Sequence, residues 1–469
     1  MGGTSTLWFV WTLATAAGAT MLLAGMLYGG GLRARLLIGA TTHGHHQIEL
    51  ACDACHTRPF GGGPVLQEAC VGCHAQELKE AKDSHPAKKF ADPRNADRLE
   101  KLDATQCVTC HREHKPDITN AMGVTLPTDY CALCHQDIGK ERPSHAGLAF
   151  DTCASAGCHN YHDNRALYAD FLVKHGREPD LNDKAVVKLR LFVNAPADPR
   201  PPLARAAADA PADKVADTAA VEDWLASAHA RAGVNCSGCH GPLQQAQKSA
   251  PAGAWSARPD HTVCATCHAQ EARTFTQGMH GMRLANGLMS SRSGLRGLFK
   301  DRPLTPMRPE LAQLPMAAAA HGRDVVCTTC HAAHRFETAA ATQVETCLGC
   351  HADEHSKAYV GSPHHKLWLA EQAGAAEKGT GVSCATCHLP RLTVEDDSGM
   401  DRMIVNHNQN ANLRPNEKMV RSVCASCHGL PFTLDALADP DLVRRNFAGR
   451  PARHIPSIDW ALEDQRTPH

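Results

Sequence analysis

The sequence predicts mainly short α-helices and loops with little β-structure, together with one N-terminal transmembrane helix. Three observations lead to this prediction. A cysteine-rich motif recurs eleven times in 469 residues and leaves only short stretches between its copies. Large core side chains are scarce, because only 5% of the residues are aromatic. A stretch of 22 residues near the N-terminus carries no charge.

The recurring motif is C-x-x-C-H, and its copies account for all 22 cysteines. One copy is stretched to C-x4-C-H. The cysteine pairs are Cys52/Cys55, Cys70/Cys73, Cys107/Cys110, Cys131/Cys134, Cys153/Cys158 (the stretched copy), Cys236/Cys239, Cys264/Cys267, Cys327/Cys330, Cys347/Cys350, Cys384/Cys387 and Cys424/Cys427. The motif histidines are His56, His74, His111, His135, His159, His240, His268, His331, His351, His388 and His428.

This motif is typical of covalent c-type haem attachment. The two thiols form thioethers with the porphyrin, and the adjacent imidazole becomes an axial ligand of the iron. A single copy could also be half a zinc site or a redox dithiol. Zinc ribbons do not need a histidine after each second cysteine, and neither does a disulfide framework. The eleven copies therefore predict eleven covalently attached haems and the fold of a multihaem cytochrome c, in which short helices and loops pack around the haems.

Residues 7–28 are long and apolar enough to cross a bilayer as a helix. Trp8, Trp11 and Tyr28 lie near the ends of this segment, where interfacial aromatic residues are common. The alternative is a cleaved signal peptide, whose apolar region would normally be shorter and would follow Lys or Arg. No basic residue precedes this segment, so we expect a retained membrane anchor.

The expected location is the periplasmic face of a bacterial inner membrane. Arg33 and Arg35 follow the apolar segment, and the positive-inside rule would place the rest of the chain in the cytoplasm. The haem motifs indicate the opposite side, because c-type cytochromes that resemble this chain mature outside the cytoplasmic membrane. Two arginines are the weaker signal, since large domains translocate largely regardless of charge. The net charge of −1 gives no basic field that would indicate nucleic acid as a partner.

Motif spacing and composition predict four parts. They are an anchor and juxtamembrane segment (1–42), a domain with five motifs (43–192), an Ala/Pro-rich linker without Cys or His (193–221), and a domain with six motifs (222–469). The linker could instead be a long surface loop of one domain. Helices are expected at 75–83, 164–175, 221–231 and 366–377.

Each motif-bearing region resembles a different family. The motif density of 43–192, with the stretched motif at Cys153, resembles the small low-potential multihaem (class III-like) cytochromes. That resemblance implies a loop-rich fold built around haems. In 222–469, His229 precedes the block Gly233-Val-Asn-Cys236, and a similar block stands at Gly381-Val-Ser-Cys384. These blocks resemble those of the pentahaem nitrite reductases and octahaem hydroxylamine oxidoreductases.

The ligand on the second face of each iron decides the function. A second strong ligand closes the site and leaves an electron carrier, whereas an open face can bind a substrate. The chain has 30 histidines, of which eleven belong to motifs, and this enrichment indicates bis-histidine ligation. The expected distal ligands are His46, His85, His114, His145, His162, His229, His280, His321, His334, His364 (or His365) and His407. His43, His261, His454 and His469 are expected to be bystanders.

Three of these distal candidates follow a motif histidine by three residues: His114, His162 and His334. Two histidines so close in sequence cannot approach one iron from opposite faces. The second of each pair is therefore expected to reach a neighbouring haem.

The expected function is electron transfer between a membrane quinol dehydrogenase or the quinone pool and periplasmic redox proteins. The alternative is a multihaem oxidoreductase of small nitrogen or sulfur species, such as nitrite, hydroxylamine or tetrathionate, with one open haem in the C-terminal domain. Two departures from the resembling reductases weaken it: no motif has Lys in place of His, and only four tyrosines lie outside the anchor. Tyr359, near His364 and His365, is the best place for such a site. No residue is predicted to be catalytic.

Overall fold

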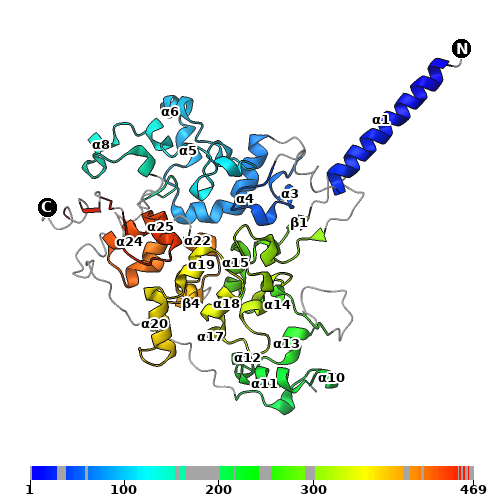
Figure 1. Cartoon of the computed structure of the whole chain (residues 1–469), viewed down its shortest axis with the longest axis vertical. Coiled ribbons are helices and arrows are strands. Elements are labelled where there is room, and N and C mark those ends of the chain that lie inside the picture. The colour runs from blue at the N-terminus through cyan, green and yellow to red at the C-terminus, as the bar shows by residue number, and fades with distance from the viewer. Residues whose placement is uncertain are drawn as a thin grey trace. The chain divides into compact units, whose positions relative to one another are not determined.

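A computed structural model describes the chain in two compact units (Figure 1). Unit 1 comprises Met1–Ala75, Asp103–Leu126 and Leu288–Leu304, and unit 2 comprises Gln76–Leu102, Pro127–Gly287 and Thr305–His469. Within these ranges the described residues are 3–28, 39–58, 62–153, 159–163, 201–215, 217–241, 255–290, 302–395, 399, 401–413, 417–452, 454–455, 458–459 and 463. The expected helix at 164–175 lies outside the described residues, as do Cys158, His175 and His469.

Unit 1 begins with α1 (Gly3–Tyr28), which is long and apolar enough to cross a membrane (Figure 1). Its window Ser5–Leu22 has a mean hydropathy of 1.2, and no part of that window is buried. These properties fit either a membrane anchor or a signal sequence.

The other described residues of unit 1 form three α-helices, one of which continues past Ala75 into unit 2, together with short 3₁₀ turns and a short antiparallel hairpin. The helices are α3 (Cys52–Cys55), α4 (Gly63–Ala81) and α7 (Cys107–Cys110), and the hairpin strands are β1 (Met289–Ser290) and β2 (Arg302–Pro303). Each of these helices contains a pair of motif cysteines. The expected helix at 75–83 is the last part of the longer α4.

Unit 2 consists of helices of four to ten residues joined by turns, with one antiparallel hairpin. The hairpin pairs β3 (Arg391–Glu395) with β4 (Asp401–Val405). The helices are α5 (Ala87–Phe90), α6 (Ala96–Lys101), α8 (Ile138–Glu141), α10 (Ala212–Val215), α11 (Thr218–Ala226), α12 (Ala228–Arg231), α13 (Cys236–His240), α14 (His261–Ala265), α15 (Ala269–Gln277), α16 (Cys327–Cys330), α17 (Thr338–Ala341), α18 (Val344–Leu348), α19 (Glu354–Tyr359), α20 (Pro363–Gln372), α21 (Cys384–His388), α22 (Gln409–Leu413), α23 (Glu417–Ser422), α24 (Leu430–Ala438) and α25 (Pro440–Arg444).

Capping residues explain where two expected helices differ from the structure. The helix expected at 221–231 is divided into α11 and α12, because Ser227 is extended and its hydroxyl accepts a hydrogen bond from the Ala230 N–H. The helix expected at 366–377 begins earlier, at Pro363, where Ser362 caps it. It ends at Gln372, just before Gly374, whose φ of 70° lies in the left-handed region.

The second half of the predicted linker is structured. The Leu203 N–H donates to the Ala230 carbonyl at 3.0 Å, and the Asn235 side chain donates to the Ala207 carbonyl at 2.5 Å. Leu203 and Ala208 pack against a small apolar cluster of Val221, Trp224 and Ala230. Residues 201–215 therefore rest on α11 and α12, while the domain boundaries at 192 and 221 stay predictions.

A larger apolar cluster lies at the C-terminal end of unit 2. It is centred on α24 and contains Met419, Val420, Leu430, Leu434, Leu437, Ile455 and Ile458. Leu434 is 1% exposed. This cluster packs against Cys387 and Cys424, two of the motif cysteines.

We expect Leu434→Ala to destabilise this cluster by about 2–5 kcal/mol, because it removes a buried side chain and leaves a cavity. Amide hydrogen exchange of α24 and α25 is the measurement, since a chain of this size need not unfold in one step. Leu369→Ala, at a position 50% exposed on α20, is the control and should change little. Equal effects of the two substitutions would contradict the assignment of this core.

His454 forms two ion pairs beside this cluster. Its Nδ1 lies 2.7 Å from Asp435 and its Nε2 lies 2.7 Å from Asp459. The hydrogen bonds that His454 donates to these two carboxylates raise its pKa to about 9. The described contacts of His454 therefore agree with a residue that is structural rather than a ligand.

Because the folded-state pKa of His454 lies above its unfolded value of about 6.5, its stabilisation is complete below that value and is lost as the pH rises through about 9. We expect His454→Gln to reduce protection of α24 amides at pH 6 and to have no effect at pH 10. Hydrogen exchange, corrected for intrinsic rates, is the measurement. A deficit that persisted at pH 10 would show that packing, and not charge, is responsible.

Candidate haem-binding sites

Where the structure describes a whole motif, its cysteines lie in or next to a helical turn. In seven of them the N–H of the motif histidine donates to the carbonyl of the first cysteine across 2.8–3.0 Å, as His56 does to Cys52 and His331 to Cys327. This bond closes one turn of helix. The turn brings the two thiols and the imidazole together from residues that are adjacent in sequence, as attachment of one macrocycle requires.

Four of these turns tighten at the second cysteine, which lies just beyond the helical segment of its motif. These residues are Cys134, Cys267, Cys350 and Cys427. The N–H of each donates to the carbonyl of the first cysteine, three residues earlier, across 3.0–3.2 Å, which is the bond of a 3₁₀ turn. The motif histidine still closes the turn in all four.

The surroundings of these second cysteines are more open than those of a core residue. Cys134 and Cys267 are exposed, and Cys427 is half-buried. The hydroxyl of the preceding residue lies 3.8 Å from the sulfur in two cases, Thr266 at Cys267 and Ser426 at Cys427. Thiols in such open surroundings are accessible to a macrocycle. The thioether roles of Cys134, Cys267 and Cys427, like those of the other motif cysteines, stay predictions.

Nine motif histidines lie opposite a second histidine within the described residues. Their ring centres are 5.9–6.3 Å apart. The pairs, with the motif histidine second, are His45–His74, His85–His135, His145–His159, His229–His268, His334–His240, His280–His351, His407–His331, His355–His388 and His364–His428.

This spacing fits an iron between two imidazoles. Two metal–nitrogen bonds of about 2 Å each, with the half-widths of two rings, add to about 6 Å between ring centres. Burial also favours the neutral imidazole that a metal requires. It lowers the pKa of His280 and of His388 to about 4, with neighbouring histidines contributing. The residues present therefore fit bis-histidine haem.

Seven of the expected distal histidines lie opposite a motif histidine: His85, His145, His229, His280, His334, His364 and His407. Two other members of the pairs were not expected, namely His45 and His355. His355 follows the motif histidine His351 by four residues, so the reasoning applied to a spacing of three would have found it. His45 and His46 are adjacent in sequence, and no local pattern indicates which of the two should lie opposite a motif histidine.

The ligand roles of all eleven expected histidines stay predictions. Of the remaining four, three make other described contacts and one is exposed. His46 Nδ1 lies 3.7 Å from Glu49, and His114 Nδ1 lies 3.0 Å from the Gly39 carbonyl. His162 Nδ1 lies 3.0 Å from Asp83. His321 is exposed and directly follows a turn at Ala318–Ala320.

A left-handed residue explains how two histidines three residues apart diverge. His334 has a φ of 67°, in the region where the chain reverses sharply. His334 lies opposite His240, while His331 lies opposite His407. The two imidazoles thus face different sites, as the spacing required. His114 has a similar φ of 61° after His111.

Most of the described contacts to Nδ1 of the paired histidines come from backbone carbonyls. His85 donates to Tyr161, His355 to Val443 and His407 to Val405, at 2.5, 2.5 and 3.0 Å. A donated Nδ1–H fixes the tautomer and makes Nε2 the acceptor nitrogen that a metal would use. At His355 this nitrogen is contacted by the Asn446 side-chain amide at 3.2 Å. Aromatic rings orient the imidazoles further: Trp255 stacks on His240 with 4.7 Å between ring centres.

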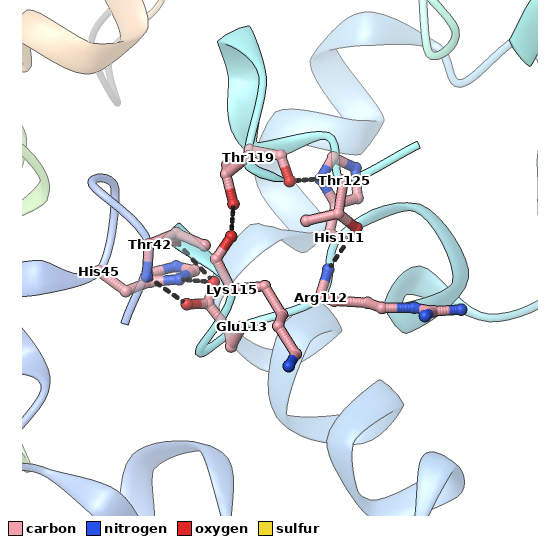
Figure 2. A network of polar contacts seen from close by, with 9 residues as sticks. Thr42, His45, His111, Arg112, Glu113, Lys115, Thr119 and Thr125 are labelled. Carbon is pink, nitrogen blue, oxygen red and sulfur yellow. Dashed lines mark hydrogen bonds and ion pairs between the residues drawn. The ribbon is translucent and has the colours of Figure 1, made fainter. Parts of the chain in front are cut away.

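His45 differs, because a carboxylate accepts its Nδ1–H (Figure 2). Glu113 Oε1 lies 2.5 Å from His45 Nδ1, and Thr42 donates to both oxygens of Glu113 from its N–H and hydroxyl. Burial raises the pKa of Glu113, but the hydrogen bonds from His45 and Thr42 outweigh it and bring the pKa to about 2. Glu113 is therefore ionised.

Several motifs that follow one another within a unit lie close together. The first cysteines of four consecutive pairs are within hydrogen-bonding distance: Cys70 and Cys107 in unit 1, and Cys131 and Cys153, Cys264 and Cys327, and Cys347 and Cys384 in unit 2. In unit 2, Cys239 also interacts with Cys264 and Cys267, Cys330 with Cys350, and Cys387 with Cys424. The last six motifs therefore form a continuous series in chain order.

Comparisons with known proteins agree with these sites. Residues 44–136, which contain four motifs, match the family of cytochrome c3. The chain is 25% identical over 208 residues to the multiheme cytochrome MtrA of Shewanella baltica (strain OS185). That match covers 42% of this chain and 43% of the relative, less than half of either. No solved structure matches the chain.

The cytochrome c3 match supports the expected resemblance of the first region, and the likeness of 222–469 to nitrite and hydroxylamine enzymes stays a prediction. The short helices and loops, the helical turns at the cysteines and both comparisons all indicate the same fold class. The fold class predicted from the sequence is confirmed: this is a multihaem cytochrome c, built mainly from short α-helices and loops with little β-structure.

Proposed function

We propose that this protein is a membrane-anchored periplasmic cytochrome c with eleven covalent haems, and that it carries electrons between a quinol-linked membrane donor and periplasmic redox proteins. The observation that carries the proposal is the nine facing histidine pairs, spaced 5.9–6.3 Å between ring centres. Bound haem would supply the one-electron couple of its iron.

The residues on both faces favour a carrier. In each pair the motif histidine would hold one axial position and its partner the other, which leaves no open position for a substrate. The carbonyls of Tyr161, Val443 and Val405 hold three of these partners in place. Fixed ligands keep the same coordination in both oxidation states, so little rearrangement accompanies electron transfer.

The adjacency of consecutive motifs supports transfer over distance. Cys264 and Cys327, and then Cys347 and Cys384, bring neighbouring attachment turns within hydrogen-bonding distance. Groups attached to such turns lie close enough to form a series. An enzyme with a single reactive centre does not require this repetition.

The described environment of Tyr359 gives no support to a substrate site there. Its side chain is 3% exposed, and its hydroxyl donates to the Val382 carbonyl at 2.6 Å. Burial raises the pKa of Tyr359 well above its usual value. A buried phenol held by a backbone carbonyl supports the fold around α21 and is poorly placed to transfer a proton.

Membrane attachment and location rest on α1 and on the haem motifs. The apolar helix could hold the chain at the membrane, near the quinone pool. Covalent haem attachment supports a periplasmic location. The relative of the Shewanella species is called a multiheme cytochrome, which agrees with an electron-transfer role.

In the oxidised, haem-loaded protein the nine facing pairs are expected to give low-spin iron, because two imidazoles would bind each of those irons. Electron paramagnetic resonance and optical spectra are the measurements, before and after addition of nitrite, hydroxylamine or cyanide. We expect the spectra to stay unchanged. A high-spin iron that bound one of these ligands would favour the multihaem oxidoreductase instead.

His355→Ala is expected to open the site of His388 and to give one new high-spin iron that binds cyanide, because His355 would be its distal ligand. His321→Ala is the matched control. His321 was expected from the sequence to be a ligand, but it is exposed in the structure. If His321→Ala opened a site and His355→Ala did not, the assignment from the structure would be wrong.

A further inference from the structure

We propose that Glu113 is a positioning residue that lowers the reduction potential of the haem attached at Cys70 and Cys73, by accepting the Nδ1–H of His45. This inference rests on the proposed function, because it requires His45 and His74 to be the axial ligands of that haem. It goes further by assigning one site a distinct potential and by naming the residue responsible.

The geometry links Glu113 to this site through one imidazole. The rings of His45 and His74 are 5.9 Å apart, and His45 Nδ1 is 2.5 Å from Glu113 Oε1. Both oxygens of Glu113 already accept hydrogen bonds from Thr42, so His45 Nδ1–H is the donor in the contact with Oε1. That tautomer leaves Nε2 of His45 to coordinate.

The carboxylate is held firmly by Thr42 (Figure 2). The Thr42 N–H donates to Oε2 and its hydroxyl donates to Oε1, both at 2.9 Å. Thr42 is 4% exposed, and the Glu113 side chain is 29% exposed. Three donors therefore converge on one largely buried carboxylate.

The segment that carries Glu113 is also anchored on both sides. Just before it, the Arg112 N–H donates to the Thr125 hydroxyl at 3.2 Å, and His111 Nδ1 contacts the Gly123 carbonyl at 3.1 Å. Just after it, His114 Nδ1 contacts the Gly39 carbonyl at 3.0 Å. Figure 2 shows His111 and Glu113 projecting to different sides of this short loop. Glu113 is thus kept in place without His45.

The charge of Glu113 acts at the attachment turns themselves. It interacts electrostatically with the thiols of Cys55 and Cys70, which belong to the first and second motifs. A negative charge in a partly buried setting is screened less than one at the surface. The charge therefore favours the more positive, oxidised state of an iron bound there.

Three other sites differ from that of His45 in the group that accepts Nδ1–H. His85, His355 and His407 give their Nδ1–H to neutral backbone carbonyls. A carboxylate acceptor makes the coordinating imidazole more basic than a carbonyl does. Hydrogen bonding around the ligands is one of the factors that set the potential of a haem. The site of His45 and His74 should consequently have a lower potential than these three.

The test is Glu113→Gln in the full-length, haem-loaded protein. Glutamine keeps the size and the carbonyl acceptor for His45 but removes the charge. We expect the midpoint potential of one haem to rise by at least the equivalent of a tenfold change in its reduction equilibrium, about 59 mV for one electron. Spectroelectrochemical titration measures the potential, and electron paramagnetic resonance verifies that the haem stays low-spin with altered g-values.

Glu68→Gln is the matched control. Glu68 is in α4 of the same unit, its side chain is 68% exposed, and it forms a long ion pair of 3.5 Å with Arg58. The Glu68→Gln variant loses the same charge as Glu113→Gln. We expect no haem in it to shift its midpoint potential by a comparable amount. An equal shift of the midpoint potential in this variant would show that only the overall charge of the protein matters. That result would overturn the proposal.

A second variant, Thr42→Val, keeps the charge and releases the hydroxyl contact to Oε1. The carboxylate then has one donor fewer and accepts more strongly from His45, so the potential of the same haem should fall, opposite to the rise expected for Glu113→Gln. Unchanged potentials in Glu113→Gln, with every iron still low-spin, would overturn the inference and leave the proposed function standing. A high-spin iron at this site in the unaltered protein would instead refute the bis-histidine assignment itself.

Discussion

The distance between facing imidazoles is the constraint on which the rest of this structure depends. Two rings about 6 Å apart can be held only if both backbones are fixed, and one of the two is always fixed locally. The helical turn of C-x-x-C-H sets the motif histidine through a bond from its own N–H, as at His56 and Cys52. The opposite histidine comes from elsewhere in the chain, so every facing pair also brings two distant segments together.

Such pairs take over part of the role that an apolar core has in other proteins. The described apolar clusters are small and lie around α11 and α24. Elsewhere the aromatic rings of the chain contact imidazoles, as Trp255 does on His240 and Phe432 on His428. With few large side chains available, ligation and packing around the ligands become the main source of tertiary stability.

Sequence reasoning succeeded where the determinants are local and failed where they are not. The fold class follows from a motif whose geometry is contained in five residues. The divergence of His331 and His334 also follows from spacing alone, and the structure adds the left-handed φ that produces it. The choice of His45 over His46 depends on Glu113, which is far away in sequence. Helix ends depended on capping by Ser227 and Ser362, whose effect is local but is easily overlooked.

The pairing of His334 with His240 has a consequence for biogenesis. A chain that crosses the membrane from its N-terminus delivers the turn at Cys236 long before His334. Two further attachment turns, at Cys264 and Cys327, emerge in the interval. A haem attached at Cys236 would thus lack its second axial ligand while haems were attached at the neighbouring motifs. It would gain that ligand only when the left-handed turn at His334 formed. If haems are attached as the motifs emerge, the order in which sites are filled would therefore differ from the order in which they are completed.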